Sequence, residues 1–101
     1  IDKFAEQFRL KWKGFKAGAM GSPQAVKDKL TKWINNNPQY SFDDILKAAD
    51  MYIKSVNNPT YLQRADYFIE KIEKGVATSR LSAFIEEIDN HTEDDWTNEI
   101  I

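Results

Sequence analysis

Apolar residues recur every three or four positions over most of the chain, which is the spacing that places side chains on one face of an α-helix. The strongest pattern covers residues 41–74, where two apolar stripes predict two antiparallel helices joined at Asn57-Asn58-Pro59. The first stripe comprises Phe42, Ile45, Leu46, Ala49, Tyr52, Ile53 and Val56, and the second comprises Tyr61, Leu62, Ala65, Phe68, Ile69 and Ile72. Burial of each such side chain contributes roughly 1.5–3 kcal/mol. We therefore expect these two helices to nucleate the core.

The same spacing predicts three further helices. The first runs over residues 2–12 with Phe4, Phe8 and Trp12 on one face, and the glycine-rich segment 13–21 is expected to be a loop. The second begins at Ser22-Pro23, since serine caps free helical amides and proline fits the first helical position. Its inner stripe comprises Val26, Leu30, Trp33 and Ile34. The last follows Ser79 and carries Leu81, Phe84, Ile85 and Ile88.

Helix ends are marked by characteristic residues. Ser41 followed by Asp43 and Asp44 is typical of a capped helix N-terminus with favourable acids in the first turn. We expect the fourth helix to run over residues 60–74 and to end at Gly75. No β-alternation is evident. The fold is therefore predicted to be all-α, a compact bundle of about five helices in one domain over residues 1–90, followed by an acidic C-terminal tail or short docking helix over residues 91–101.

Composition excludes several classes of site. The chain has no cysteine, so it can form no disulfide, thiolate nucleophile or zinc–cysteine site. No apolar run approaches the ~18–20 residues of a membrane span. We expect a soluble, cytoplasmic protein with no membrane partner.

Charge is distributed unevenly. The net charge of −2 combines +5 over residues 1–40, zero over residues 41–85 and −7 over residues 86–101. A basic region attracts phosphate, whereas an acidic region repels or mimics it. We therefore expect binding sites for partners in the basic and the acidic end regions of the chain.

Catalytic signatures are lacking. His91 is the single histidine, and neighbouring acids do not complete a zinc set, so we interpret it as a solvated residue. The pair Asp43/Asp44 is explained by helix capping, and the pair Asp94/Asp95 lies in the tail. The glycines match neither of the phosphate-binding motifs GxxxxGK(S/T) and GxGxxG. We predict no enzymatic activity, no metal, no cofactor and no small-molecule substrate.

The basic segment 9–18 is the leading candidate for function. Cations interleaved with aromatic rings can contact phosphates and stack on bases of single-stranded nucleic acid. The alternative is that Trp12 and Phe15 cover the bundle while the lysines are merely solvated. The candidate nucleic-acid-binding residues are Arg9, Lys11, Trp12, Lys13, Phe15 and Lys16, extended by Lys27, Lys29 and Lys32 on the next helix.

The acidic C-terminal segment is a candidate partner-binding site. Acids followed by apolar residues can dock on a basic, grooved protein. Alternatively, Trp96 and Ile100 pack back on the bundle as a short helix, or the segment competes with nucleic acid for the basic loop. The candidate partner-binding residues are Asp94, Asp95, Trp96, Ile100 and Ile101.

The order of several motifs resembles a known family over about residues 4–72. The motifs are Phe4 and Phe8, the basic loop 13–18, Leu30-x-x-Trp33, Tyr40-Ser41-x-Asp43-x-Ile45-Leu46-x-Ala48, Tyr52-Ile53, Thr60-Tyr61 and Tyr67-Phe68-Ile69. Together they resemble the helical domains of phage replication proteins of the replisome-organiser and helicase-loader type. The resemblance implies contact with single-stranded or origin DNA and with a replicative helicase or another replisome protein.

Two functions follow as expectations. The first is a non-catalytic phage or mobile-element DNA-replication accessory module that binds single-stranded DNA and a replisome protein. The alternative is a protein-interaction adaptor that regulates host machinery such as RNA polymerase without contacting nucleic acid. An enzyme remains only as a subunit whose active site lies elsewhere. Salt dependence distinguishes the first two, because phosphate contacts weaken steeply with ionic strength.

Overall fold

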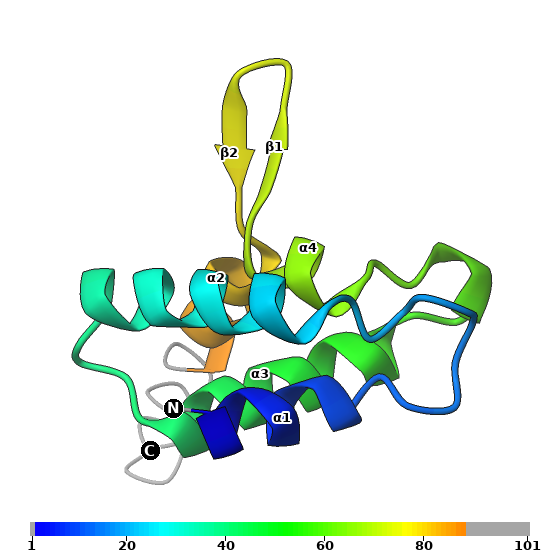
Figure 1. Ribbon diagram of the computed structural model, residues 1–101, viewed down its shortest axis with the longest axis horizontal. Coiled ribbons are helices and arrows are strands. Elements are labelled where there is room, and N and C mark those ends of the chain that lie inside the picture. The colour runs from blue at the N-terminus through cyan, green and yellow to red at the C-terminus, as the bar shows by residue number, and fades with distance from the viewer. Residues whose placement is uncertain (1, 89–101) are drawn as a thin grey trace, which may run out of the picture.

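Three helices frame the molecule in the computed structural model, which describes residues 2–88. They are α1 (Asp2–Leu10), α2 (Pro23–Asn36) and α3 (Phe42–Ser55). Helix α1 packs against both α2 and α3, which lie above it and beside it in Figure 1. A further helical segment spans residues 80–88. The prediction of a mostly helical chain is confirmed.

Predicted caps define the starts of these helices. The Ser22 hydroxyl accepts a hydrogen bond of 3.1 Å from the Ala25 N–H, and Pro23 occupies the first helical position. Ser41 and Asp44 form a reciprocal capping box in which each side chain accepts from the other residue's backbone N–H. Capping therefore accounts for the acidic start of α3.

The predicted fourth helix is wrong over most of its length. The segment contains a single 3₁₀ turn, η1 (Pro59–Tyr61), an extended stretch, and the short helix α4 (Ala65–Ile69). Side chains from elsewhere bind the backbone of the extended stretch: the Trp12 indole N–H donates to the Gln63 carbonyl at 2.9 Å, and the Gln63 N–H donates to the Tyr52 hydroxyl at 2.7 Å. These tertiary hydrogen bonds replace the helical ones.

A β-hairpin occupies the end of the predicted fourth helix and the loop after it, so the all-α prediction is also wrong here. Strands β1 (Lys71–Glu73) and β2 (Val76–Thr78) pair antiparallel and project away from the helices (Figure 1). The turn residues Lys74 and Gly75 both have positive φ, 50° and 80°. That combination is required by a type I′ hairpin turn, for which glycine is well suited. Gly75 thus turns a hairpin and does not end a helix.

The core is built from the faces of all these helices and from Trp12. Phe8, Trp12 and Phe68 are at most 1% exposed, and their ring centroids lie 5.0 to 6.1 Å apart. Tyr52 stacks on Phe68 at 4.8 Å. The largest fully buried side chains also include Leu30, Ile45, Leu62, Ile69, Leu81, Ile85 and Val26.

Three residues expected in the core are exposed. Tyr61 is 77% exposed because it belongs to the 3₁₀ turn, and Ile72 is 67% exposed because it belongs to the hairpin. Phe42 is 46% exposed, although its ring stacks on Phe4 at 4.1 Å. Within residues 2–88, no helix has the length and apolar character to cross a membrane.

Candidate nucleic-acid interface

The glycine-rich loop between α1 and α2 is tied to the segment that precedes α4. The Ala65 N–H donates to the Ala19 carbonyl at 2.8 Å, and the Lys16 ammonium donates to the Thr60 carbonyl at 2.9 Å. Gly14, Gly18 and Gly21 have φ values of 91°, 79° and 70°, a left-handed conformation that favours glycine. The loop therefore has a defined path across the 60–65 segment.

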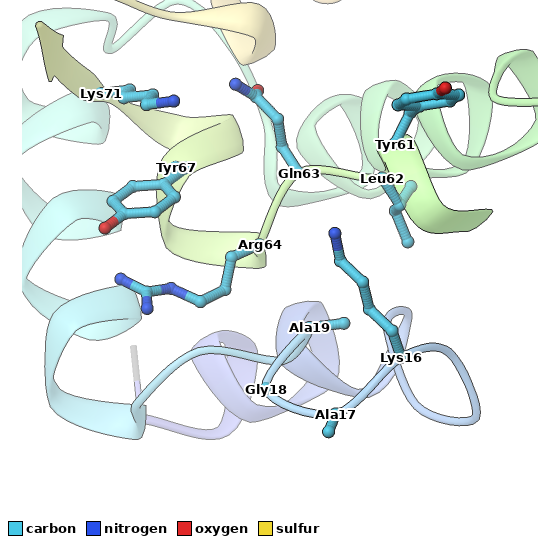
Figure 2. Close-up of a pocket in the computed structure, with 10 residues that line it drawn as sticks. All are labelled: Lys16, Ala17, Gly18, Ala19, Tyr61, Leu62, Gln63, Arg64, Tyr67 and Lys71. Carbon is cyan, nitrogen blue, oxygen red and sulfur yellow. The ribbon is translucent and has the colours of Figure 1, made fainter. Parts of the chain in front are cut away.

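Two adjoining cavities lie along this loop, and we call them together the basic furrow. Their volumes are about 370 and 420 Å³, and they share Lys16, Gly18, Ala19 and Arg64. The first is shown in Figure 2 and is completed by Ala17, Tyr61, Leu62, Gln63, Tyr67 and Lys71. The second is completed by Arg9, Trp12, Gly14, Phe15, Met20, Gly21 and Ser22. Four cationic residues and no carboxylate line the furrow within the described part of the chain.

Three cationic side chains lie close to the ring of Tyr67 at one end of the furrow. The Arg64 guanidinium lies 4.1 Å from the centre of its ring, and the ammonium groups of Lys29 and Lys71 lie at 5.2 and 5.4 Å. In the view of Figure 2, Tyr67 lies between Lys71 and Arg64. Cations within about 6 Å of an aromatic ring are attracted by its quadrupole. Carboxylates also offset the mutual repulsion of these cations, because Asp66 pairs with Arg64 and Lys29, and Glu73 lies 2.6 Å from the Lys71 ammonium.

A buried carboxylate orients Arg64. Asp66 is 2% exposed, and its two oxygens accept hydrogen bonds of 2.6 and 2.8 Å from Arg64, while the Lys29 ammonium lies 3.8 Å away. Burial by itself raises the pKa of Asp66, but the hydrogen bonds and charge of Arg64, with the charge of Lys29, leave that pKa below its ordinary value. Asp66 is therefore a buried, ionised carboxylate that lies beneath the furrow and orients Arg64.

Because Gly21 has no side chain, the loop can lie directly against the Asp66 carboxylate. A Cβ at Gly21 would lie 2.8 Å from an Asp66 carboxylate oxygen, whereas a Cβ at Gly18 would meet nothing within 4 Å. We expect Gly18→Ala to cost about 1 kcal/mol, from left-handed backbone strain alone. Gly21→Ala should cost at least about 1 kcal/mol more, because it also disturbs the buried ion pair. Urea denaturation of both variants measures the two losses in the free energy of unfolding. Equal losses would show that the Asp66 carboxylate does not restrict the side chain at position 21.

The structure places only some of the predicted nucleic-acid-binding residues at the furrow. Arg9, Phe15 and Lys16 line the furrow, and Lys29 adjoins it through Tyr67. Lys13 is exposed on the loop. Trp12 is the clear correction: it is 1% exposed, so its ring faces pack in the core and are not available to bases.

The remaining predicted cations form ion pairs and do not line the furrow. Lys11 lies 3.1 Å from Asp50 of α3. Lys27 lies 2.7 Å from Asp2 of α1. Lys32 lies 3.2 Å from Glu70, whose carbonyl also accepts a hydrogen bond from Lys29. Asp50 and Glu70 offset part of the net charge of +5 over residues 1–40, whereas Asp2 is already counted in that total.

Sequence reasoning missed Tyr61, Arg64, Tyr67 and Lys71. A signal was present, because residues 64, 67 and 71 recur at spacings of three and four. The signal was hidden by Asp66 and Glu70, which make the net charge of the region zero. The structure buries Asp66 under the furrow and pairs Glu70 with Lys32, so Arg64 and Lys71 line the furrow while the two carboxylates do not.

Several candidates lie outside the described residues. These are His91 and the proposed partner-binding residues Asp94, Asp95, Trp96, Ile100 and Ile101. Among residues 2–88, no group of three or more histidine, cysteine, aspartate or glutamate side chains could hold a metal ion.

Comparison with known proteins assigns no family. No protein-family model, curated protein or solved structure matches this chain.

Proposed function

We propose that this chain is a non-catalytic nucleic-acid-binding module whose contact surface is the basic furrow. The observation that carries the proposal is the convergence of Arg9, Lys16, Arg64 and Lys71 on two adjoining cavities that no described carboxylate lines. Such a lining attracts phosphates, and phosphate contacts supply most of the affinity in non-specific nucleic-acid binding.

Exposed rings beside the furrow favour a single strand. Tyr61 is 77% exposed and lines one cavity, and Phe15 is 37% exposed and lines the other. Bases of a single strand stack on such rings, each stack contributing roughly 1–3 kcal/mol, whereas paired bases are stacked on each other already. The narrower role, a phage or mobile-element DNA-replication accessory module that also binds a helicase or another replisome protein, rests on the sequence resemblance.

The adaptor alternative is favoured by a different observation. The hairpin projects from the helices with Ile72 67% exposed and Val76 61% exposed. The register pairs Ile72 with Ala77 and Val76 with Glu73, so the two exposed side chains lie on opposite faces of the hairpin. Exposed apolar residues on a projecting element can anchor a protein partner. In this alternative the hairpin binds a component of host machinery such as RNA polymerase, and the furrow contacts no nucleic acid.

Salt-dependent binding of a fluorescent single-stranded oligonucleotide tests the proposal. We expect affinity to fall steeply between about 50 and 200 mM salt. Lys16→Ala should weaken binding and reduce the slope of log affinity against log salt by about 0.7, the value for one phosphate contact to a single strand. Fluorescence anisotropy measures both quantities.

The matched control is Lys47→Ala, because Lys47 is an exposed lysine on α3 that lines neither cavity. It should leave affinity and slope unchanged. Equal effects of the two substitutions would show that binding follows net charge and not the furrow. No binding at low salt would overturn the proposal and favour the adaptor.

A further inference from the structure

Arg9 has an unused donor beside the glycine loop. Its side chain is 13% exposed. One terminal nitrogen donates to Glu6 at 2.7 Å, and the other donates to the Gly21 carbonyl at 3.2 Å. The Nε atom is buried and has no hydrogen-bond partner within the described part of the protein. A buried donor without a partner costs about 1–3 kcal/mol, so a small shift of the adjoining glycine loop that admits an acceptor to this N–H would remove the cost.

The cavity of about 420 Å³ that Arg9 lines is suited to an anion. Lys16 and Arg64 line it with Arg9, and no described carboxylate does. Ser22, the N-cap of α2, lines it too, so the positive end of that helix dipole adjoins the cavity. Gly14 and Gly18 in its wall carry no side chain to fill the space, and added Cβ atoms would meet nothing within 4 Å.

The carboxylates near these cations leave donors free. Glu6 engages a terminal nitrogen of Arg9 and not its Nε. Asp66 engages Nε and Nη2 of Arg64 and leaves Nη1 outside the pair. Glu6 and Asp66 thus offset the charges of the two arginines from outside the lining, while the Lys16 ammonium donates only to a neutral carbonyl, that of Thr60, among the described residues.

We propose that this cavity binds one phosphate group, with the Arg9 Nε–H as the directed donor and Lys16 and Arg64 supplying charge. The inference rests on the proposed nucleic-acid binding, for which it names the anchoring point of the strand. The phosphate can be an internal phosphodiester, a terminal phosphate of the strand or inorganic phosphate. All three offer the anionic oxygens that guanidinium groups bind.

Arginine side-chain NMR tests the site directly, because the chain contains only three arginines, Arg9, Arg64 and Arg80. The full chain, labelled with ¹⁵N, is titrated with inorganic phosphate and then with oligonucleotides carrying a 5′-phosphate or a 5′-hydroxyl. Chloride at matched ionic strength is the control. We expect phosphate to shift the Arg9 Nε–H signal more than the Arg80 signal. A response to both oligonucleotides identifies an internal phosphodiester, and a response to the 5′-phosphate form alone identifies the terminal group.

Affinity provides a second readout. Arg9→Lys keeps the positive charge but removes the Nε–H, and it should weaken oligonucleotide binding by roughly tenfold. Arg80→Lys makes the same chemical change at an exposed position that lines neither cavity of the furrow, and it should have no effect. The wild-type titration does not depend on either variant folding.

The outcomes separate this inference from the proposed function. An Arg9 signal that stays in place while the oligonucleotide binds would overturn the phosphate site and leave the proposed function standing. An Arg9 signal that shifts with inorganic phosphate, in a protein that binds no oligonucleotide, would support the site and overturn the proposed function. A shift that chloride reproduces equally would overturn the site.

Discussion

Replacement of Trp12 by alanine should lower the free energy of unfolding by about 3–5 kcal/mol, the range for large aromatic truncations in a core. The ring is 1% exposed and packs against Phe8 and Phe68, with centroids 5.0 and 5.5 Å away. Its indole N–H donates to the Gln63 carbonyl, so truncation also leaves a part-buried acceptor unpaired. Small domains have only about 5–15 kcal/mol of stability. The loss would therefore be a large fraction of the whole.

Urea denaturation followed by far-ultraviolet circular dichroism measures this loss. Phe15→Ala is the matched control, since Phe15 is an aromatic residue of the same loop but is 37% exposed. It should change stability by no more than about 0.5 kcal/mol. A similarly small effect of Trp12→Ala would contradict the packing. Because this substitution acts on the fold, Trp12 is unsuitable for testing nucleic-acid binding.

Replacement of Asp66 by asparagine should cost about 2–3 kcal/mol at neutral pH, a range set by the loss of charge-assisted hydrogen bonds and the partial exposure of Arg64. The substitution keeps the shape of the side chain but removes the charge that pairs with Arg64 and Lys29. Asp50→Asn removes the carboxylate of a partly exposed pair with Lys11, and it should cost less than about 1 kcal/mol.

The effect of Asp66→Asn should depend on pH in a defined direction. The pKa of Asp66 in the folded protein lies below its ordinary value of 3.8, so folding favours the charged form. The stability that the pair contributes is complete above the unfolded pKa and is lost as the pH falls through the folded pKa. The difference between wild type and variant should therefore shrink below about pH 4. Denaturation curves across this range provide the test, and a difference that stays constant in acid would contradict the linkage.

Local sequence signals predicted the helical frame well. Ser22-Pro23 and Ser41 mark the starts of α2 and α3, because a cap is satisfied by residues within one turn. The burial of Phe4 and Phe8 likewise follows from their helical spacing. In these cases the determining interactions lie close together in the chain. Trp12 does not fit this pattern, because α1 ends at Leu10 and not at Trp12 as the spacing predicted.

The segment from residue 60 to residue 78 shows the opposite behaviour. Its apolar spacing favours one long helix, yet Trp12 and Tyr52 bind the backbone at Gln63, and the Lys74-Gly75 turn closes a hairpin. The first effect depends on side chains from distant parts of the chain. The second depends on a two-residue turn that helical periodicity does not reveal.

By itself, the sequence determined the starts of α2 and α3, the glycine loop and most of the apolar core, because caps, backbone freedom and burial act over a few residues. Only the tertiary structure decided which cations gather. It pairs Lys11 and Lys27 with carboxylates, buries Asp66 beneath Arg64, and brings Lys16 and Lys71 from distant segments to one furrow. The physical reason is that electrostatic potential depends on distances in space and on burial. Neither can be read from the order of charges along a chain.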